Sequence, residues 1–90
     1  MRIKKILVEL NVEEKINKKH RVYREEIDNA LFEGNPIYFK TRKNNYMAIT
    51  LKERYITIVF KYNKNIANIK TAYPSSDGQI RLYKKRRLKK

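Results

Sequence analysis

The chain has 90 residues, of which 23 are Lys or Arg and 9 are Asp or Glu, so its formal net charge is +14. A chain this short forms one small domain with a single core, and its cationic excess indicates a polyanionic partner, most often nucleic acid. It has no Cys and a single His, which excludes disulfides, thiolate catalysis and His-rich metal sites. We therefore expect no metal and no other cofactor.

The N-terminal region predicts two helices. Residues 3–10 form either a short strand or a lead-in, and their apolar run is too short for a signal peptide or a membrane span. Asn11 is expected to cap a helix over Val12 to Lys19, which has acids in its first turn and bases at its end. A second helix is expected over Tyr23 to Glu33, with Gly34 as its C-terminal stop. We expect a cytoplasmic protein that does not contact a membrane.

From Pro36 onward, apolar residues recur with a period of two, which predicts strands joined by short polar turns. We expect four strands, at Ile37 to Thr41, Tyr46 to Leu51, Tyr55 to Lys61 and Ile66 to Tyr73. Met47, Ile49 and Leu51 form an apolar row along the second of them. The sheet is therefore expected to be mainly antiparallel and to pack one face on the two helices, in an α+β domain.

The last predicted strand leads into a third, basic helix. Alternation along the strand places Lys70 and Ala72 on its outward side, opposite Thr71. Ser76 and Gln79 fit an S-x-x-Q capping box, which predicts that the helix begins there. Ser76 lacks a nearby base, so we interpret it as a cap and not as a nucleophile.

Charge is unevenly divided along the chain. Six of the nine acids lie within residues 13–33, in the two predicted helices. Residues 34–76 hold eight Lys and Arg with Glu53 as the only acid, and no acid follows Asp77. The sheet and the last helix are thus expected to form the basic side of the molecule, with residues 84–90 as a basic tail that can fray.

Six short motifs follow one another along the chain: Lys19-His20-x-Val22, EEI-x-x-AL at 25–31, Asn45-Tyr46-Met47-Ala48-Ile49, Tyr55-Ile56-Thr57-Ile58-Val59-Phe60, Ile69-x-Thr71-Ala72 and RLYKKR at 81–86. In this order and spacing they resemble the BrnT-type toxins of the RelE superfamily and their DUF4258 relatives. The resemblance covers about residues 10–87. It implies a single RelE-like α+β toxin domain over residues 1–90, ribonuclease activity on messenger RNA, on or off the ribosome, and a neutralising antitoxin. The basic side of the molecule further predicts that this antitoxin is acidic.

Two positions depart from the family pattern. BrnT-like sequences usually carry Arg just before the Tyr-x-Ala strand and Arg after the Ala that ends the last strand, where this chain has Asn45 and Tyr73. Two phosphate-binding arginines of the family are therefore either missing or replaced from elsewhere, by Arg42, Lys43 or Lys70. The departures leave a second hypothesis open, a non-catalytic RNA- or DNA-binding module with the same fold.

Metal-free RNA cleavage needs a group that takes the proton of the 2′-hydroxyl, cations that hold the phosphate and a donor for the leaving oxygen. The candidate catalytic residues are Lys70, Tyr73, Arg81, Tyr83 and His20. The candidate RNA- and phosphate-binding residues are Lys40, Arg42, Lys43, Arg54, Lys84, Arg86 and Arg87. Tyr73 and Tyr83 could equally pack in the core, and His20 could serve only to favour the end of its helix.

Overall fold

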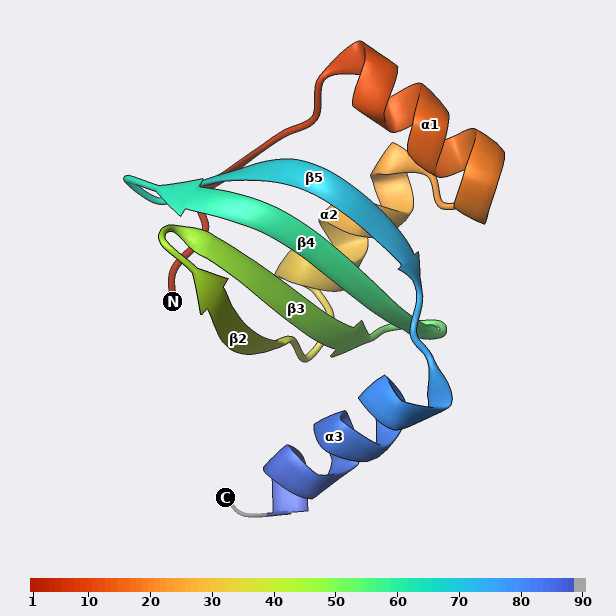
Figure 1. Ribbon diagram of the computed structural model, residues 1–90, viewed down its shortest axis with the longest axis vertical. Coiled ribbons are helices and arrows are strands. Elements are labelled where there is room, and N and C mark those ends of the chain that lie inside the picture. The colour runs from red at the N-terminus through yellow and green to blue at the C-terminus, as the bar shows by residue number, and fades with distance from the viewer. Residues whose placement is uncertain (89–90) are drawn as a thin grey trace.

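The computed structural model describes residues 1–88, which form a five-stranded sheet and three helices (Figure 1). The elements in chain order are β1 (Lys5–Leu7), α1 (Leu10–His20), α2 (Arg24–Phe32), β2 (Ile37–Arg42), β3 (Asn45–Leu51), β4 (Tyr55–Asn63), β5 (Ile66–Pro74) and α3 (Asp77–Leu88). The α+β class and the two N-terminal helices are confirmed. The expected count of about four strands is wrong, because residues 3–10 contribute β1.

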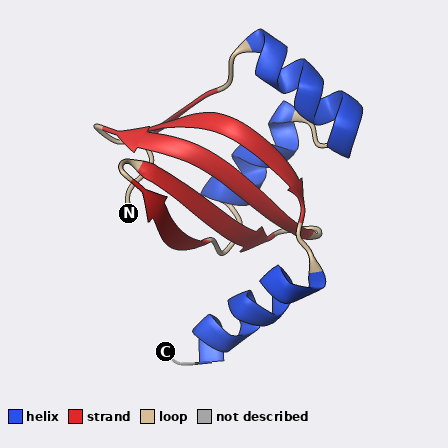
Figure 2. Cartoon of the chain, viewed as in Figure 1, coloured by secondary structure: helices blue, strands red, loops and turns tan. Residues whose placement is uncertain are grey.

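The strand order is β1-β5-β4-β3-β2. β2 to β5 form an antiparallel meander, whereas β1 pairs in parallel with the first residues of β5. In Figure 2, α2 lies behind the sheet, α1 lies beyond the β5 edge, and α3 leaves the end of β5 and lies below the sheet. None of these described helices is long and apolar enough to cross a membrane.

The core lies between the sheet and the first two helices. Ala48, Ile58 and Phe60 are fully buried on the sheet and pack with Ile16 of α1 and Ile27 of α2. Each large apolar side chain removed from water in this way stabilises the fold by about 1.5–3 kcal/mol. The apolar spacing in these two helices therefore determines which sheet face they cover.

The apolar row of β3 points away from this core. Met47 and Ile49 pair across the ladder with Val59 and Thr57, on the opposite face from Ala48. The expectation that this row packs on the two helices is wrong. Both faces of β3 are buried in part, since α3 packs over the second face, so an apolar row did not identify which face the helices would cover.

The predicted helix ends are correct for α3 and wrong for α1. The Ser76 hydroxyl accepts from the Gln79 backbone N–H at 3.2 Å, and the Gln79 side-chain oxygen accepts from the Ser76 N–H at 2.9 Å, which confirms the capping box. In α1, Glu9 is the N-cap and Asn11 lies inside the helix, with no side-chain cap hydrogen bond. The described part of the predicted basic tail, residues 84–88, is helical, and residues 89 and 90 lie outside the described residues.

Gly34 is required for close packing and not for a left-handed turn. α2 ends at Phe32 with Glu33 as a right-handed cap, and Gly34 has no positive φ. A Cβ on Gly34 would lie 2.5 Å from the Ala30 carbonyl oxygen and 2.6 Å from the Thr50 hydroxyl oxygen. These two atoms are themselves joined by a 2.8 Å hydrogen bond that the Thr50 hydroxyl donates. The loop after α2 therefore approaches β3 closely because residue 34 has no side chain.

Replacing Gly34 with Ala is expected to lower the free energy of unfolding by about 1–3 kcal/mol, because the new methyl group overpacks this contact. Urea denaturation measures the change. Gly78→Ala is the matched control, since its Cβ would meet only the Ser76 hydroxyl oxygen at 3.9 Å. The control should be neutral or stabilising by up to about 1 kcal/mol through helix propensity. Equal losses in the two variants would contradict this role for Gly34.

Candidate nucleic-acid interface

The side of the sheet opposite α1 and α2 is only partly covered, and we call it the open face. Its alternate residues, paired in register from β2 to β5, include the half-buried Phe39, Met47, Val59, Thr71 and Tyr73. The open face thus presents aromatic and apolar side chains that cations flank. Such a surface can stack bases and hold the backbone of single-stranded nucleic acid.

A β-bulge places Lys70 on the open face. Val59 pairs with Thr71, but Phe60 pairs with Ile69, so Lys70 has no partner on β4. The extra residue shifts the alternation, and Ala72 joins Ile69 in the core while Lys70 is exposed. The expected outward position of Lys70 is confirmed. The placement of Ala72 beside it and Thr71 opposite is wrong, because simple alternation does not anticipate a bulge.

His20 and Tyr73 meet at the end of the sheet. Their ring centroids lie 5.7 Å apart with an interplanar angle of 53°. β1 pairs only with residues 66–68 of β5, and α1 packs against β5, so the C-terminal end of α1 reaches the last residues of that strand. Two candidate catalytic residues that are 53 positions apart in the sequence are therefore neighbours.

The Tyr73 hydroxyl belongs to a polar network at the start of α3. Gln79 Nε2 donates to the Tyr73 hydroxyl at 3.1 Å, and the Thr57 hydroxyl donates to Gln79 Oε1 at 2.9 Å. The Thr57 and Ser75 hydroxyl oxygens are 2.7 Å apart. Thr57 is fully buried, so this network attaches the beginning of α3 to the open face of β4.

Tyr83 holds α3 against the end of the sheet. Its side chain is buried, its hydroxyl donates to the Asn35 carbonyl at 2.7 Å, and its ring packs edge-on against Tyr55 at 5.5 Å. The Arg87 guanidinium lies 5.7 Å from the Tyr83 ring centroid and donates to its hydroxyl at 3.3 Å. Of the two interpretations that the sequence leaves open for Tyr83, the geometry favours packing.

The remaining cations of α3 differ in their surroundings. The Arg86 guanidinium lies 4.8 Å from the Phe39 ring centroid, which brings it over the open face. Arg81 and Lys84 are exposed. A guanidinium on an aromatic ring keeps its outer N–H groups free for phosphate oxygens, so Arg86 and Phe39 together form a cationic and aromatic contact.

The other candidate phosphate-binding residues are spread around the sheet. Arg42 pairs with Asn45 on the open face, at the end of the sheet remote from Tyr73, and Lys43 lies in the turn beside it. Lys40 pairs with Tyr46, which contacts the core, so it belongs to the helix-covered side. These three exposed cations do not converge with Lys70 on one phosphate.

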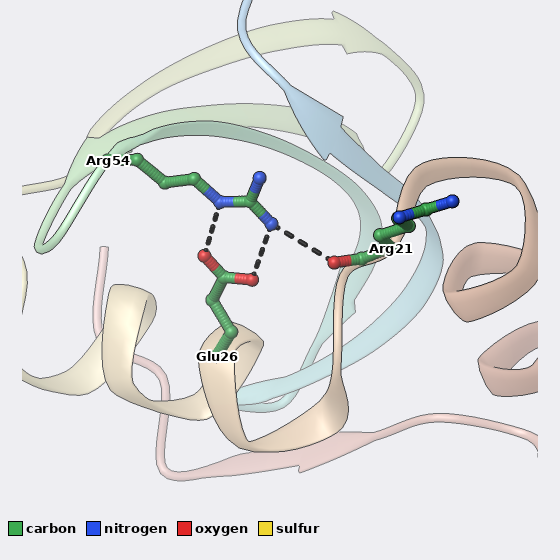
Figure 3. Close-up of polar contacts among 3 residues, drawn as sticks. All are labelled: Arg21, Glu26 and Arg54. Carbon is green, nitrogen blue, oxygen red and sulfur yellow. Dashed lines mark hydrogen bonds and ion pairs between the residues drawn. The ribbon is translucent and has the colours of Figure 1, made fainter.

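Arg54 is engaged in an ion pair on the helix side (Figure 3). Its guanidinium donates to both Glu26 carboxylate oxygens, at 2.7 and 2.8 Å, and to the Arg21 carbonyl at 3.1 Å. The hydrogen bond with Glu26 raises the pKa of Arg54 above its ordinary value. Arg54 thus links the β3–β4 turn to the loop and helix that follow α1.

The cavity beside this ion pair is distinct from the open face. It has a volume of about 360 Å³. Its lining includes Arg21, Glu26, Asn29, Lys52 and Arg54. Because charges of both signs line it, this cavity does not suit a polyanion. Within residues 1–88, no group of three or more His, Asp or Glu side chains is arranged to hold a metal ion.

Three residues on or beside the open face were not among the candidates. Phe39 lies beneath Arg86, Gln79 holds Tyr73, and Lys61 pairs with Asn45. The sequence contained a signal for Lys61, since a period of two along β4 places it with Thr57. The signal for Gln79 was the capping box. A capping box accounts for the start of the helix but does not predict the hydrogen bond from Gln79 Nε2 to the Tyr73 hydroxyl.

The fold is similar to that of a solved toxin. The crystal structure of the Brucella abortus ribonuclease toxin BrnT matches this chain with a TM-score of 0.66 at 18% sequence identity, covering 81% of this chain and 97% of the toxin. The chain has a BrnT-like fold. No protein-family model and no curated protein matches the sequence. The similarity confirms the toxin fold expected from the motifs, whereas activity depends on the side chains of the site.

Proposed function

We propose that this chain is a toxin-like, metal-independent endoribonuclease of the RelE superfamily, related to DUF4258 proteins, that cleaves messenger RNA in the cytoplasm. The observation that carries the proposal is the contact of His20 with Tyr73 at the end of the open face, on the strand whose bulge exposes Lys70. The BrnT-like fold supports it, because the solved neighbour is a ribonuclease toxin. The acidic residues between positions 13 and 33 lie in α1, in α2 and directly after α2, on the other side of the sheet from this face.

The proposed reaction is attack of a ribose 2′-oxygen on the adjacent phosphorus. The new bond closes a 2′,3′-cyclic phosphate, the bond to the 5′-oxygen of the next nucleotide breaks, and that oxygen takes a proton from solvent. His20 can take the 2′-hydroxyl proton, and Tyr73 can donate to an oxygen of the phosphate. Lys70 lies three residues before Tyr73 on the same strand and can hold the negative charge that develops on the phosphate. Arg81, exposed on α3, can bind the neighbouring backbone.

The two departures from the family pattern both lie on the open face. Asn45 pairs with Lys61 and Arg42, so cations flank the position where BrnT-like sequences carry Arg. Tyr73 occupies the second position and pairs with Thr57. This substitution favours the second hypothesis, a non-catalytic RNA- or DNA-binding module, to the extent that Tyr cannot supply the charge of Arg. Inducing the chain in cells separates the two, since a nuclease arrests growth and a passive binder does not.

Purified protein is expected to cleave messenger RNA without added metal, and Lys70→Ala should lower single-turnover cleavage about a hundredfold while reducing RNA binding much less. Lys70 would then act mainly on charge that develops during the reaction. The assay is run with and without ribosomes. Lys64→Ala, in the β4–β5 turn, is the matched control that removes one exposed Lys near the same strand. Absence of cleavage in both settings leaves the binding module as the function.

Arg81→Ala combined with Arg86→Ala should weaken RNA binding for all sequences and make the plot of log affinity against log salt shallower by about 0.7 per lost contact on single strands. Binding isotherms between low and high salt measure the slope. Arg54→Ala is the control, because the Arg54 guanidinium is bound to Glu26 and should leave the slope unchanged. A parental slope in the double variant would show that α3 does not contact the backbone.

We also propose that an acidic antitoxin covers the open face and α3. The charge of +14, with few acids outside residues 13–33, favours rapid association of an acidic segment with this side. Affinity purification from the native source should recover an acidic protein that competes with RNA. A partner whose binding protects α1 and α2 from hydrogen exchange, and not the open face, would contradict this proposal.

A further inference from the structure

Gln79 uses both ends of its side-chain amide. Its Oε1 accepts from the Thr57 hydroxyl and from the Ser76 backbone N–H, each at 2.9 Å. Its Nε2 donates to the Tyr73 hydroxyl at 3.1 Å and lies 3.8 Å from the Met47 sulfur. The residue that caps α3 therefore also contacts a candidate catalytic side chain.

The orientation of this amide is determined by its partners. A backbone N–H can only donate, so the end of Gln79 that faces Ser76 must be the carbonyl oxygen. A flipped amide would set its own N–H groups against the Ser76 N–H, with no acceptor between the two donors. The amino end of Gln79 must therefore face Tyr73. Thr57 has a single hydroxyl proton, which goes to Gln79, and its oxygen accepts from Ser75.

The direction of these hydrogen bonds leaves the Tyr73 proton free. The Tyr73 oxygen accepts from Gln79, and the Tyr73 hydroxyl donates no hydrogen bond to another group within residues 1–88. Tyr73 is half-buried on the open face, beside His20 and on the strand that carries Lys70. A phenol held in this way can donate to a ligand oxygen and is restrained from turning its proton inward.

We propose that Gln79 is a positioning residue that keeps the Tyr73 hydroxyl as a hydrogen-bond donor to a phosphate oxygen of bound RNA. This inference rests on the proposed function and adds to it the direction of one proton. It also links the start of α3 to the site, because the same amide completes the capping box. Any change that keeps the cap but reverses the bond to Tyr73 should therefore impair RNA recognition without unfolding the helix.

Gln79→Glu makes this change. The carboxylate still accepts from Ser76 and Thr57, and S-x-x-E is itself a capping box. Its second oxygen can only accept, so the Tyr73 proton turns inward toward it. Binding is measured with a 2′-O-methyl RNA that cannot be cleaved, and single-turnover cleavage with the unmodified RNA. Gln79→Glu and Tyr73→Phe are each expected to weaken binding and slow cleavage about tenfold, the range of a hydrogen bond to a charged group.

A double-mutant cycle separates positioning from a general effect on structure. If Gln79 acts through Tyr73, adding Gln79→Glu to Tyr73→Phe should lower RNA affinity and cleavage rate no further than the new negative charge does by itself. Gly78→Glu measures that charge effect, since a side chain at residue 78 has open space and is adjacent to residue 79. Unfolding midpoints check that each variant is folded. Thr57→Val, which removes one group that orients the amide, should produce a smaller loss that again requires Tyr73.

Each outcome decides the inference. Fully multiplicative losses in the cycle would show that Gln79 acts independently of Tyr73 and would overturn it. Parent protein that binds the 2′-O-methyl RNA but cleaves no RNA would refute the nuclease, and the binding cycle alone would then decide the role of Gln79. Parent protein that binds no RNA would overturn both proposals.

Discussion

The pairing of β4 with β5, with its one extra residue, controls the geometry of the rest of the molecule. Before the bulge, Ile69 belongs to the core face, and after it the core position passes to Ala72. Without the extra residue, Tyr73 and Ala72 would exchange faces, since a shift of one residue moves every later side chain to the other side of the sheet. The bulge thus places Lys70, Thr71 and Tyr73 on the open face while the core stays filled.

The attachment of α3 depends on a few polar contacts and one buried side chain. α3 is highly charged, and Tyr83 is its one buried residue among the described positions. The Tyr83 hydroxyl bonds the loop after α2, and the capping box joins the start of the helix to the network around Thr57. A helix held by these contacts can expose most of its Lys and Arg side chains. Its cations therefore extend the basic surface of the open face without the cost of burial.

Fold and chemistry are supported by different observations in this protein. The match to a ribonuclease toxin concerns the path of the backbone, at 18% identity. The proposed chemistry depends on four side chains. The bulge exposes Lys70, His20 contacts the Tyr73 ring, and the Gln79 amide binds the Tyr73 hydroxyl. Since one backbone can support several chemistries, the side chains of the open face decide whether this chain cleaves RNA or only binds it.

Local patterns predicted much of the secondary structure. The period of two found the four antiparallel strands, because β-branched and aromatic residues alternate there with polar ones. The S-x-x-Q pattern located the start of α3, because its two hydrogen bonds join residues three positions apart. The pattern does not decide between a strand and a lead-in for residues 3–10, since the three residues of β1 are too few for a periodic signal. The Asn11 cap was wrong because the helix begins at Leu10, with Glu9 as its N-cap, and not at Val12 as the pattern predicted.

The basic charge, its separation from the acids of residues 13–33 and the antiparallel strands could all be predicted from the amino-acid sequence, because they follow from composition and from contacts between near neighbours. The packing of the folded chain, in contrast, determines that Met47 faces α3 and that Arg54 binds Glu26. It also determines that His20 meets Tyr73 and that Gln79 orients the Tyr73 hydroxyl. These contacts depend on how separate elements pack against one another. A periodic pattern within one element does not predict which other element will pack on each of its faces.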